Sequence, residues 1–261
     1  MKDMQAIEAE NRRKYSGEAY DARTICARAE NDAKDYSSRM LQLKFEMVAR
    51  QCPGEVLVDL CCGAGASLQT TALGRTTAIG LDFSEPFLRH AEHHRRGQGD
   101  ARIAFACANA RAIPLASATV DALYSLSSLY YVPALGEVIA EIARILRPGG
   151  RCVLDLGAGP SLNTVVCRSY PELAVSCHVT VEEMLDACRA HALAIVEHRC
   201  FQILPMWGDR PRWLKPLLHP IWARLLALRV NGRMLDEWIS SLPVLRRFAF
   251  RHVLLCERVP A

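Results

Sequence analysis

The chain has 261 residues, of which 51% are hydrophobic and 23% are charged. These proportions are those of an ordinary globular protein, so they exclude a largely disordered chain or a fibrous repeat. The formal net charge of +4 is too small to indicate a nucleic-acid-binding surface, and we expect no nucleic acid partner. The length suits one α/β domain, 1–261, with an N-terminal cap (1–54), a core (55–156) and a later half (157–261).

The cysteines and the N-terminus bear on the cellular compartment. The eleven cysteines are odd in number and form no Cys-x-x-Cys pair, so we expect neither disulfides nor a metal site. Residues 1–14 are rich in charge and do not resemble a signal peptide. No apolar run approaches the length of a transmembrane helix. These features favour a cytoplasmic protein.

The first two thirds of the chain show the periodicity of an α/β fold. Residues 31–50 carry apolar side chains at helical spacing, which predicts a helix that covers the mouth of the sheet. From Val56 to Leu156, short β-branched runs alternate with helical stretches, which is typical of parallel strands joined by helices. Strands are predicted at 56–60, 78–82, 103–107, 122–126 and 152–156, and helices at 67–73, 85–96 and 135–146.

The later half completes a doubly wound, mostly parallel sheet of seven strands with helices on both faces. A helix is predicted at 182–190, and strands at 194–203 and 249–257 are expected to pair antiparallel at the sheet edge. Between these strands, residues 205–243 hold all four tryptophans, five prolines and several arginines, and we interpret them as an insertion before the last strand. A packed lid and a segment on a membrane surface are the two alternatives for this insertion.

Two features predict a nucleotide site at the ends of the first strands. The run 59–65 (DLCCGAG) follows a buried strand, and its glycines let the backbone approach a ligand closely because they lack a Cβ. A tight connection without a ligand is the alternative interpretation. Asp82 stands at the tip of the second strand, 17 residues after Gly65 (82 minus 65). A carboxylate there can accept hydrogen bonds from both hydroxyls of a ribose.

Five runs in order resemble the motifs of class I S-adenosylmethionine-dependent methyltransferases, nearest to the quinone-methylating, methyltransferase-11-like branch. These runs are 59–65, 78–84, 108–115, 120–132 and 145–151. Cys61 replaces the first glycine of the family's loop, and Asn109 replaces the usual aspartate of the third motif. Tyr130 and Tyr131 stand where the family often has histidines. The resemblance implies a Rossmann-like methyltransferase fold.

The resemblance also implies S-adenosyl-L-methionine as the cofactor, bound within 55–156. By analogy, the first loop surrounds the methionine part of the cofactor, Asp82 binds the ribose and Phe83 packs on the adenine. Asn109 still has a carbonyl oxygen that can accept a hydrogen bond from the adenine amino group. The implied cofactor contacts are Asp59, Cys61, Gly63, Gly65, Asp82, Phe83, Asn109, Ala110 and Ser125.

The implied reaction is transfer of a methyl group to an oxygen, nitrogen or carbon atom of a small molecule, with an apolar or lipid-like acceptor among the candidates. The enzyme's main task is to align the acceptor with the sulfur–carbon bond and to exclude water. An oxygen acceptor also needs a base. Tyr130, Tyr131, Asp155 and His178 are candidates for this base by position, and none is singled out.

Two other functions remain as alternatives. A nicotinamide-dependent oxidoreductase also uses a glycine loop and an acid, but its motif requires glycine at position 68, where this chain has Leu68. A non-catalytic regulatory protein with a degenerate methyltransferase fold is left open by Cys61 and Asn109. Peripheral contact with a membrane is also left open, and the oligomeric state is not predicted.

Overall fold

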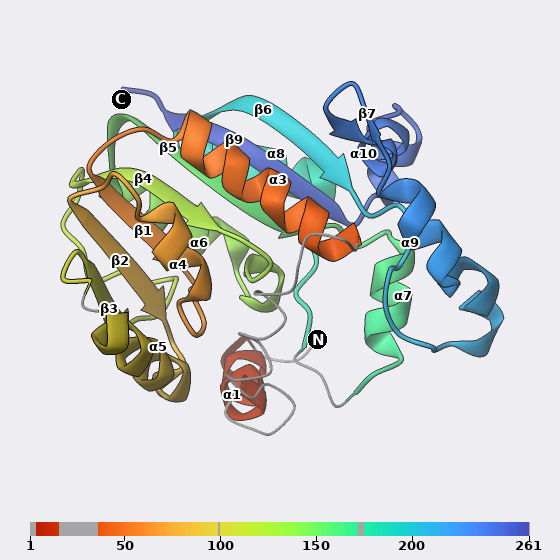
Figure 1. Cartoon of the computed structure of the whole chain (residues 1–261), viewed down its shortest axis with the longest axis horizontal. Coiled ribbons are helices and arrows are strands. Elements are labelled where there is room, and N and C mark those ends of the chain that lie inside the picture. Colours follow the sequence, from red (N-terminus) through yellow and green to blue (C-terminus); the bar gives the residue numbers. More distant parts are fainter. Residues whose placement is uncertain (1–3, 16–35, 99, 172–174, 261) are drawn as a thin grey trace.

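The computed structural model describes residues 4–15, 36–98, 100–171 and 175–260. Figure 1 shows one twisted sheet across the molecule with helices in front of it and behind it. Residues 31–35 of the helix predicted at 31–50 lie outside the described residues.

The main sheet has seven strands in the order β3-β2-β1-β4-β5-β9-β6. The five strands from β3 to β5 are parallel to one another, and β9 is antiparallel to both β5 and β6. The predicted fold class is therefore confirmed, including the antiparallel pairing of the last two strands, although β9 lies inside the sheet and only β6 is at its edge. The strands are β1 (Val56–Leu60), β2 (Thr77–Asp82), β3 (Ile103–Cys107), β4 (Val120–Ser125), β5 (Leu146–Gly157), β6 (Leu193–Phe201) and β9 (Arg251–Arg258).

Helices cover both faces of the sheet because each has one apolar side. On α6 (Leu135–Ile145), Val138, Ile139 and Ile142 are fully buried in a cluster that also contains Met184 of α8 (Val181–Ala190). On the other face, α3 (Tyr36–Gln51) and α4 (Ala66–Thr71) share a second cluster with the sheet. α5 (Glu85–Gln98) packs on β2 and β3, and α7 (Leu162–Arg168) follows β5.

The predicted N-terminal helix forms, but its expected position was wrong. Met40, Leu43 and Met47 of α3 are buried against the sheet's face, so this helix does not cover the sheet's mouth. An apolar stripe indicates that one side of a helix is buried, but it does not indicate which surface buries it. The mouth is covered by α1 (Met4–Tyr15), where Asn11 Nδ2 donates to the Tyr131 carbonyl oxygen at 2.8 Å. Figure 1 shows α1 at the bottom of the view, to the right of α5.

The insertion between β6 and β9 folds into short elements beside α3. Its inner side is buried, because Leu226, Ala227 and Met234 belong to the cluster that contains α3, and Arg39 donates to the Ala227 carbonyl oxygen at 2.8 Å. No described helix is long and apolar enough to cross a membrane. The elements are η3 (Arg212–Leu218), α9 (Pro220–Leu226), β7 (Arg229–Val230), β8 (Arg233–Met234), α10 (Leu235–Ser240) and η4 (Leu245–Phe248).

The turn after β1 is built on left-handed residues. Cys61, Gly63 and Gly65 have φ angles of +63°, +55° and +73°. A Cβ atom on Gly65 would lie 2.7 Å from ring atoms of Phe105, whereas a Cβ atom on Gly63 would meet nothing within 4 Å. Both glycines therefore provide the backbone conformation, and Gly65 also makes room for a neighbouring ring.

We expect Gly65→Ala to destabilise the fold more than Gly63→Ala. Both alanines carry the left-handed backbone strain of about 1–2 kcal/mol. Only the alanine at position 65 adds overpacking against Phe105, which costs roughly 1–3 kcal/mol more. Urea unfolding of the two variants measures the difference directly. Equal unfolding free energies would show that the ring of Phe105 yields without cost.

Candidate active site

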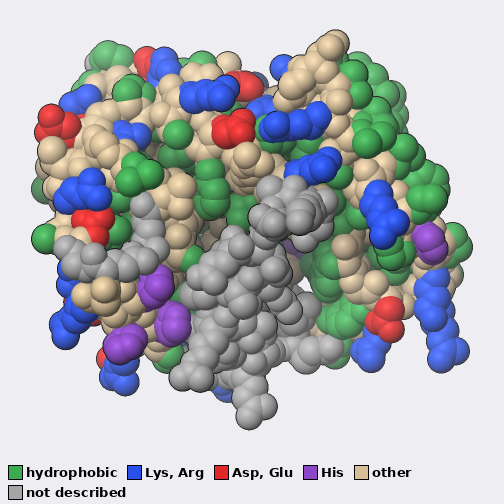
Figure 2. Space-filling view, viewed as in Figure 1, with side chains coloured by type: hydrophobic (Ala, Val, Ile, Leu, Met, Phe, Trp, Pro, Cys, Tyr) green, Lys and Arg blue, Asp and Glu red, His purple; other side chains and the backbone are tan. Residues whose placement is uncertain are grey.

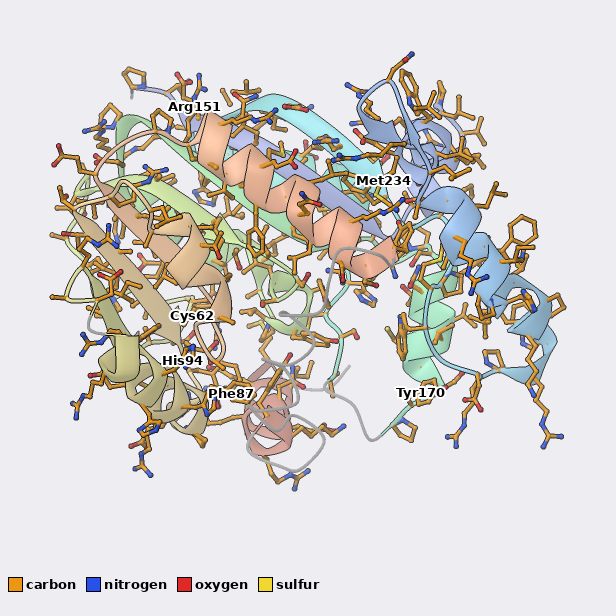
Figure 3. The ribbon with its side chains drawn as sticks, in the orientation of Figure 1. Cys62, Phe87, His94, Arg151, Tyr170 and Met234 are labelled. Atoms are coloured by element: carbon orange, nitrogen blue, oxygen red, sulfur yellow. The ribbon has the colours of Figure 1, made fainter. Side chains whose placement is uncertain are left out.

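A pocket lies at the carboxyl ends of β1, β2 and β3, where parallel α/β sheets bind their ligands. Its space is about 440 Å³ with the open mouth included, but only about 30 Å³ admits the centre of a water molecule. Glu8 and Asn11 of α1 form one wall. Five of the predicted cofactor contacts form the opposite side, namely Cys61, Asp82, Phe83, Asn109 and Ala110. Figure 3 shows Cys62 and Phe87 beside this end of the sheet, with Phe87 next to α1.

Asp82 joins the two motifs that the sequence predicted to meet. Its Oδ2 accepts a hydrogen bond from the Gly63 amide and its Oδ1 accepts one from the Ser84 amide, each at 2.8 Å. Only 7% of the residue is exposed, and burial raises the pKa of the carboxyl group. Each carboxylate oxygen has more than one acceptor position, so both can still bind a ligand hydroxyl.

The other four predicted contacts do not line this pocket. Gly63 and Gly65 shape the turn behind it. Asp59 accepts hydrogen bonds from Ser67 Oγ at 2.8 Å and from the Tyr124 hydroxyl at 2.9 Å, and burial raises its pKa to about 7. The Asp59 carboxyl group thus accepts its hydrogen bonds from side chains of α4 and β4. Ser125 is fully buried at the end of β4.

Glu8 is a pocket residue that the sequence did not indicate. Asn109 Oδ1 accepts from the Arg111 amide at 3.0 Å, and its Nδ2 donates to Glu8 Oε1 at 2.7 Å. These two contacts fix the orientation of the amide, so Asn109 presents donors on the side of α1. Arg111 also bonds the other carboxylate oxygen of Glu8. The acceptor at this wall therefore comes from α1, whose polar sequence gave no periodic signal.

A second and larger cavity lies on the other side of α1, next to α7, with about 900 Å³ of space when its open mouth is included. Glu10 and Lys14 of α1 line it together with Arg168, Tyr170 and His178. Lys14 pairs with Glu10 at 3.0 Å. Figure 3 shows Tyr170 beside α7, to the right of α1 and Phe87. The two cavities thus flank one helix at the same end of the sheet.

His178 has the properties of a neutral base. Its Nδ1 lies 3.2 Å from Thr164 Oγ1, and that hydroxyl donates to the Ala158 carbonyl oxygen at 3.3 Å. When the Thr164 proton lies on the Ala158 carbonyl oxygen, Nδ1–H donates to Thr164 and Nε2 carries no proton. No group in the described part of the chain bonds Nε2. Burial and the nearby Arg251 lower the pKa of the imidazole to about 4.

The other candidate bases are less suited to take a proton. Asp155 Oδ2 accepts from Lys44 Nζ at 2.6 Å and from Arg251 at 3.0 Å. Burial alone would raise the pKa of Asp155, but these two cations hold it below its usual value. Burial raises the pKa of Tyr130 to about 12. Tyr131 is half-buried, and its ring lies against Tyr15 of α1.

Comparison with known proteins identifies a family model that covers the strands around the first pocket. Residues 58–154 match the family model described as "Methyltransferase domain". Over these residues the chain is similar to a methyltransferase domain. The match begins in β1 and ends in β5, so it includes the glycine turn and Asp82 and leaves out α1, α3 and the insertion.

Named relatives act on different molecules. The chain is 32% identical over 166 residues to 27-O-demethylrifamycin SV methyltransferase of Amycolatopsis mediterranei, covering 62% of this chain and 61% of that protein. It is 32% identical over 100 residues to 24-methylenesterol C-methyltransferase 2 of Oryza sativa, covering 38% and 28%. It is 34% identical over 112 residues to demethylmenaquinone methyltransferase of Lactococcus lactis, covering 42% and 44%. The chain therefore spans 28% to 61% of the length of these relatives.

Solved structures share the fold of the methyltransferase domain and of its surroundings. Geranyl diphosphate C-methyltransferase from Streptomyces coelicolor superimposes with a TM-score of 0.59 at 20% identity, covering 85% of this chain and 79% of that one. The cyclase SpnF superimposes with a TM-score of 0.60 at 20% identity, covering 95% and 96%. Proteins of this fold therefore catalyse more than one reaction, and the function has to be inferred from the residues of the site.

One group of residues away from the methyltransferase site could hold a metal ion. In the described ranges, His198, Cys200 and His252 bring their ligand atoms within 4.8 Å of one another. His198 Nε2 lies 2.8 Å from His252 Nδ1, and His252 Nε2 lies 3.1 Å from the Ala249 carbonyl oxygen. Arg246 bonds the remaining nitrogen of His198. Each ring nitrogen thus has a partner, and a guanidinium stands beside the cluster, so its geometry is that of a hydrogen-bonded chain.

Proposed function

We propose that the protein transfers a methyl group from S-adenosyl-L-methionine to a small-molecule acceptor. The observation that carries the proposal is the bond between the Gly63 amide and the Asp82 carboxylate, because it brings the glycine turn and the acid at the strand tip to one pocket. The matching domain and the methyltransferase relatives support the same activity. Geranyl diphosphate C-methyltransferase was solved with S-adenosyl-L-homocysteine, which is the demethylated cofactor.

The residues that line the pocket suit the nucleoside part of this cofactor. Phe83 and Leu81 supply apolar surface for a purine, and Asp82 supplies acceptors for two ribose hydroxyls. The cofactor would supply an electrophilic methyl group on a positively charged sulfur. The chain's own contribution is alignment of the acceptor and exclusion of water, and α1 provides part of that exclusion by covering the pocket.

The nicotinamide alternative finds no support at the turn. Leu68, where that motif needs glycine, is fully buried in the cluster shared with α3.

We further propose that the chain acts as a single domain in the cytoplasm, without a nucleic acid partner. The ten described cysteines are all free, which suits a reducing compartment.

We expect Asp82→Ala to weaken binding of S-adenosyl-L-homocysteine by about 1.5–3 kcal/mol, because hydrogen bonds to a charged group are lost. Isothermal titration calorimetry measures the change. Asp100→Ala is the matched control, since Asp100 pairs with Arg102 on the surface and does not line the pocket. Far-UV circular dichroism verifies that the variant is folded. An unchanged affinity in folded Asp82→Ala protein would remove Asp82 from the site.

We also propose that Glu8 accepts the hydrogen bond of the adenine amino group. Asn109 was predicted for this role, and its oxygen accepts from the Arg111 amide while its amino group points at Glu8. Each Glu8 oxygen also has one partner, Asn109 or Arg111, so the two residues differ in charge and not in free acceptor positions. A carboxylate accepts more strongly than an amide, and Glu8 lines the pocket beside Asn109. The N-terminal helix would then replace the aspartate that the family usually places after the third strand.

Glu8→Ala should weaken S-adenosyl-L-homocysteine by about 1.5–3 kcal/mol and should leave almost unchanged the binding of its 6-deamino analogue, in which a hydrogen replaces the amino group. Calorimetry with both ligands gives the comparison. Glu137→Ala is the control, because Glu137 pairs with the same arginine from outside the pocket. Equal losses for the two ligands would mean that α1 merely closes the pocket.

We propose that the second cavity takes the acceptor and that His178 removes its proton. Of the four candidate bases, His178 alone combines a neutral ring, an unpartnered Nε2 in the described part of the chain and a place in the cavity wall. Because Arg168, Lys14 and Ser176 also line the cavity, it favours an acceptor with polar groups over a wholly apolar one. The acceptor would thus carry a hydroxyl or amino group.

His178→Asn keeps a polar group near the Nδ1 position and removes Nε2. We expect methyl transfer to slow by about 10²–10⁴-fold, with affinity for S-adenosyl-L-homocysteine unchanged. The assay follows label from methyl-labelled cofactor into the small molecules of a cell extract. The pKa of about 4 means that His178 is already unprotonated near neutral pH, so the rate should fall only in acid, as the imidazole takes up a proton.

His191→Asn is the control for this variant, because His191 lies at the end of α8, away from the cavity. A rate that His178→Asn leaves untouched would exclude His178 as the base. A wild-type protein that binds the cofactor and labels no small molecule would instead favour a regulatory protein or another reaction on the same fold.

A further inference from the structure

The insertion carries most of the exposed large hydrophobic side chains of the described residues. Nine of the thirteen lie between residues 213 and 248, although this stretch is a small part of the chain. Exposed apolar residues are normal when they are scattered singly, but a concentration of this kind marks a contact surface. We call it the insertion surface, and it consists of Trp213, Ile221, Leu225, Leu228, Val230, Trp238, Leu242, Val244 and Phe248.

The apolar exposure on α9 follows helical spacing. Ile221, Leu225 and Leu228 are separated by four and three residues, so they lie along one side of the helix and its end. Leu226, on another side, is buried in the cluster that contains α3. A surface helix ordinarily has polar residues opposite its buried side, and α9 has an exposed leucine and isoleucine stripe there instead.

Hydrogen bonds hold the parts of the insertion surface together. Trp238 Nε1 donates to the Val230 carbonyl oxygen at 3.1 Å, which places the indole against the β7–β8 hairpin. The Leu235 amide donates to the Leu228 carbonyl oxygen at 2.7 Å, which joins α10 to the end of α9. Figure 1 shows α9, α10 and β7 at one end of the sheet, and Figure 2 shows hydrophobic and basic side chains together on that side.

The exposed charges of this region are almost all positive. Residues 205–248 contain three acids, and two of them are buried: Asp236 bonds Tyr36, and Glu237 pairs with Arg199. Asp209 is the one exposed acid in that stretch. Seven basic residues of the stretch are exposed, namely Arg210, Arg212, Lys215, Arg224, Arg229, Arg233 and Arg247. Arg229 lies 3.9 Å from Glu46 and Arg233 lies 3.7 Å from Glu237, so the positive charge of these two is partly balanced.

We propose that the insertion surface docks on the face of a membrane that contains anionic lipids. Exposed aliphatic stripes with interleaved cations and tryptophans are the features of segments that lie in the headgroup region. The positive charge complements anionic headgroups and would repel a second copy of the same surface. The proposed attachment is peripheral, by side chains at the surface of the insertion. The proposal does not depend on the methyltransferase activity.

The test is co-sedimentation of the full chain with vesicles of phosphatidylcholine, with and without phosphatidylserine, at low and high salt. We expect binding to the vesicles that contain phosphatidylserine, little binding to phosphatidylcholine alone, and weaker binding in high salt. Leu225→Ser with Trp238→Ser, and separately Arg224→Glu with Arg229→Glu, should each reduce the bound fraction at least about tenfold. Thermal melting of each variant verifies that it is folded.

The matched controls are Leu73→Ser and Arg89→Glu, which change an exposed leucine and an exposed arginine far from the insertion in the sequence. Both should bind vesicles like the wild type. Failure of the folded wild type to bind phosphatidylserine vesicles would overturn the proposal, as would equal binding to both vesicle types. Self-association that the insertion variants abolish, without vesicle binding, would assign the surface to a protein interface instead.

Discussion

The hydrogen bond from the Gly63 amide to the Asp82 carboxylate is the constraint on which the cofactor pocket depends. Leu60 and Leu81 are paired in the parallel strands β1 and β2, so the two strands end next to each other at the same edge of the sheet. A buried carboxylate without partners would be costly, and Asp82 avoids this cost by accepting two backbone amides. The same bonds hold the glycine turn against the acid, which is why two motifs far apart in the sequence share one ligand space.

The strands and core helices could be predicted because their signals are local. The spacing of Val138, Ile139 and Ile142 indicates the buried side of α6, and each strand of the core shows as a short apolar run. The place of α3 could not be predicted, since its apolar stripe fits either a face or a mouth. The position of α1 could not be predicted either, because it depends on long-range contacts such as that of Asn11 with Tyr131, 120 residues away.

Five of the nine predicted contacts line the pocket, but the sequence did not indicate the direction in which each side chain points. Asp59 belongs to the family's first motif, and yet its carboxyl group faces Ser67 and Tyr124. Asn109 sits at the pocket wall, and its orientation is fixed by Glu8, which no motif includes. Cys61 shows the opposite case: it replaces a glycine of the motif and still has a φ of +63°, so the turn keeps its left-handed geometry.

Acidic and basic side chains are separated at this end of the sheet. On the cofactor side, Asp82 and Glu8 offer acceptors. On the other side, Lys44 and Arg251 share the single carboxylate Asp155, so this buried network contains more positive than negative charge. Burial lowers the pKa of Lys44 to about 8, so it remains largely protonated at neutral pH. Arg251, together with burial, opposes protonation of His178. The network that anchors α3 to β5 therefore adds to burial in favouring the neutral form of an imidazole in the wall of the neighbouring cavity.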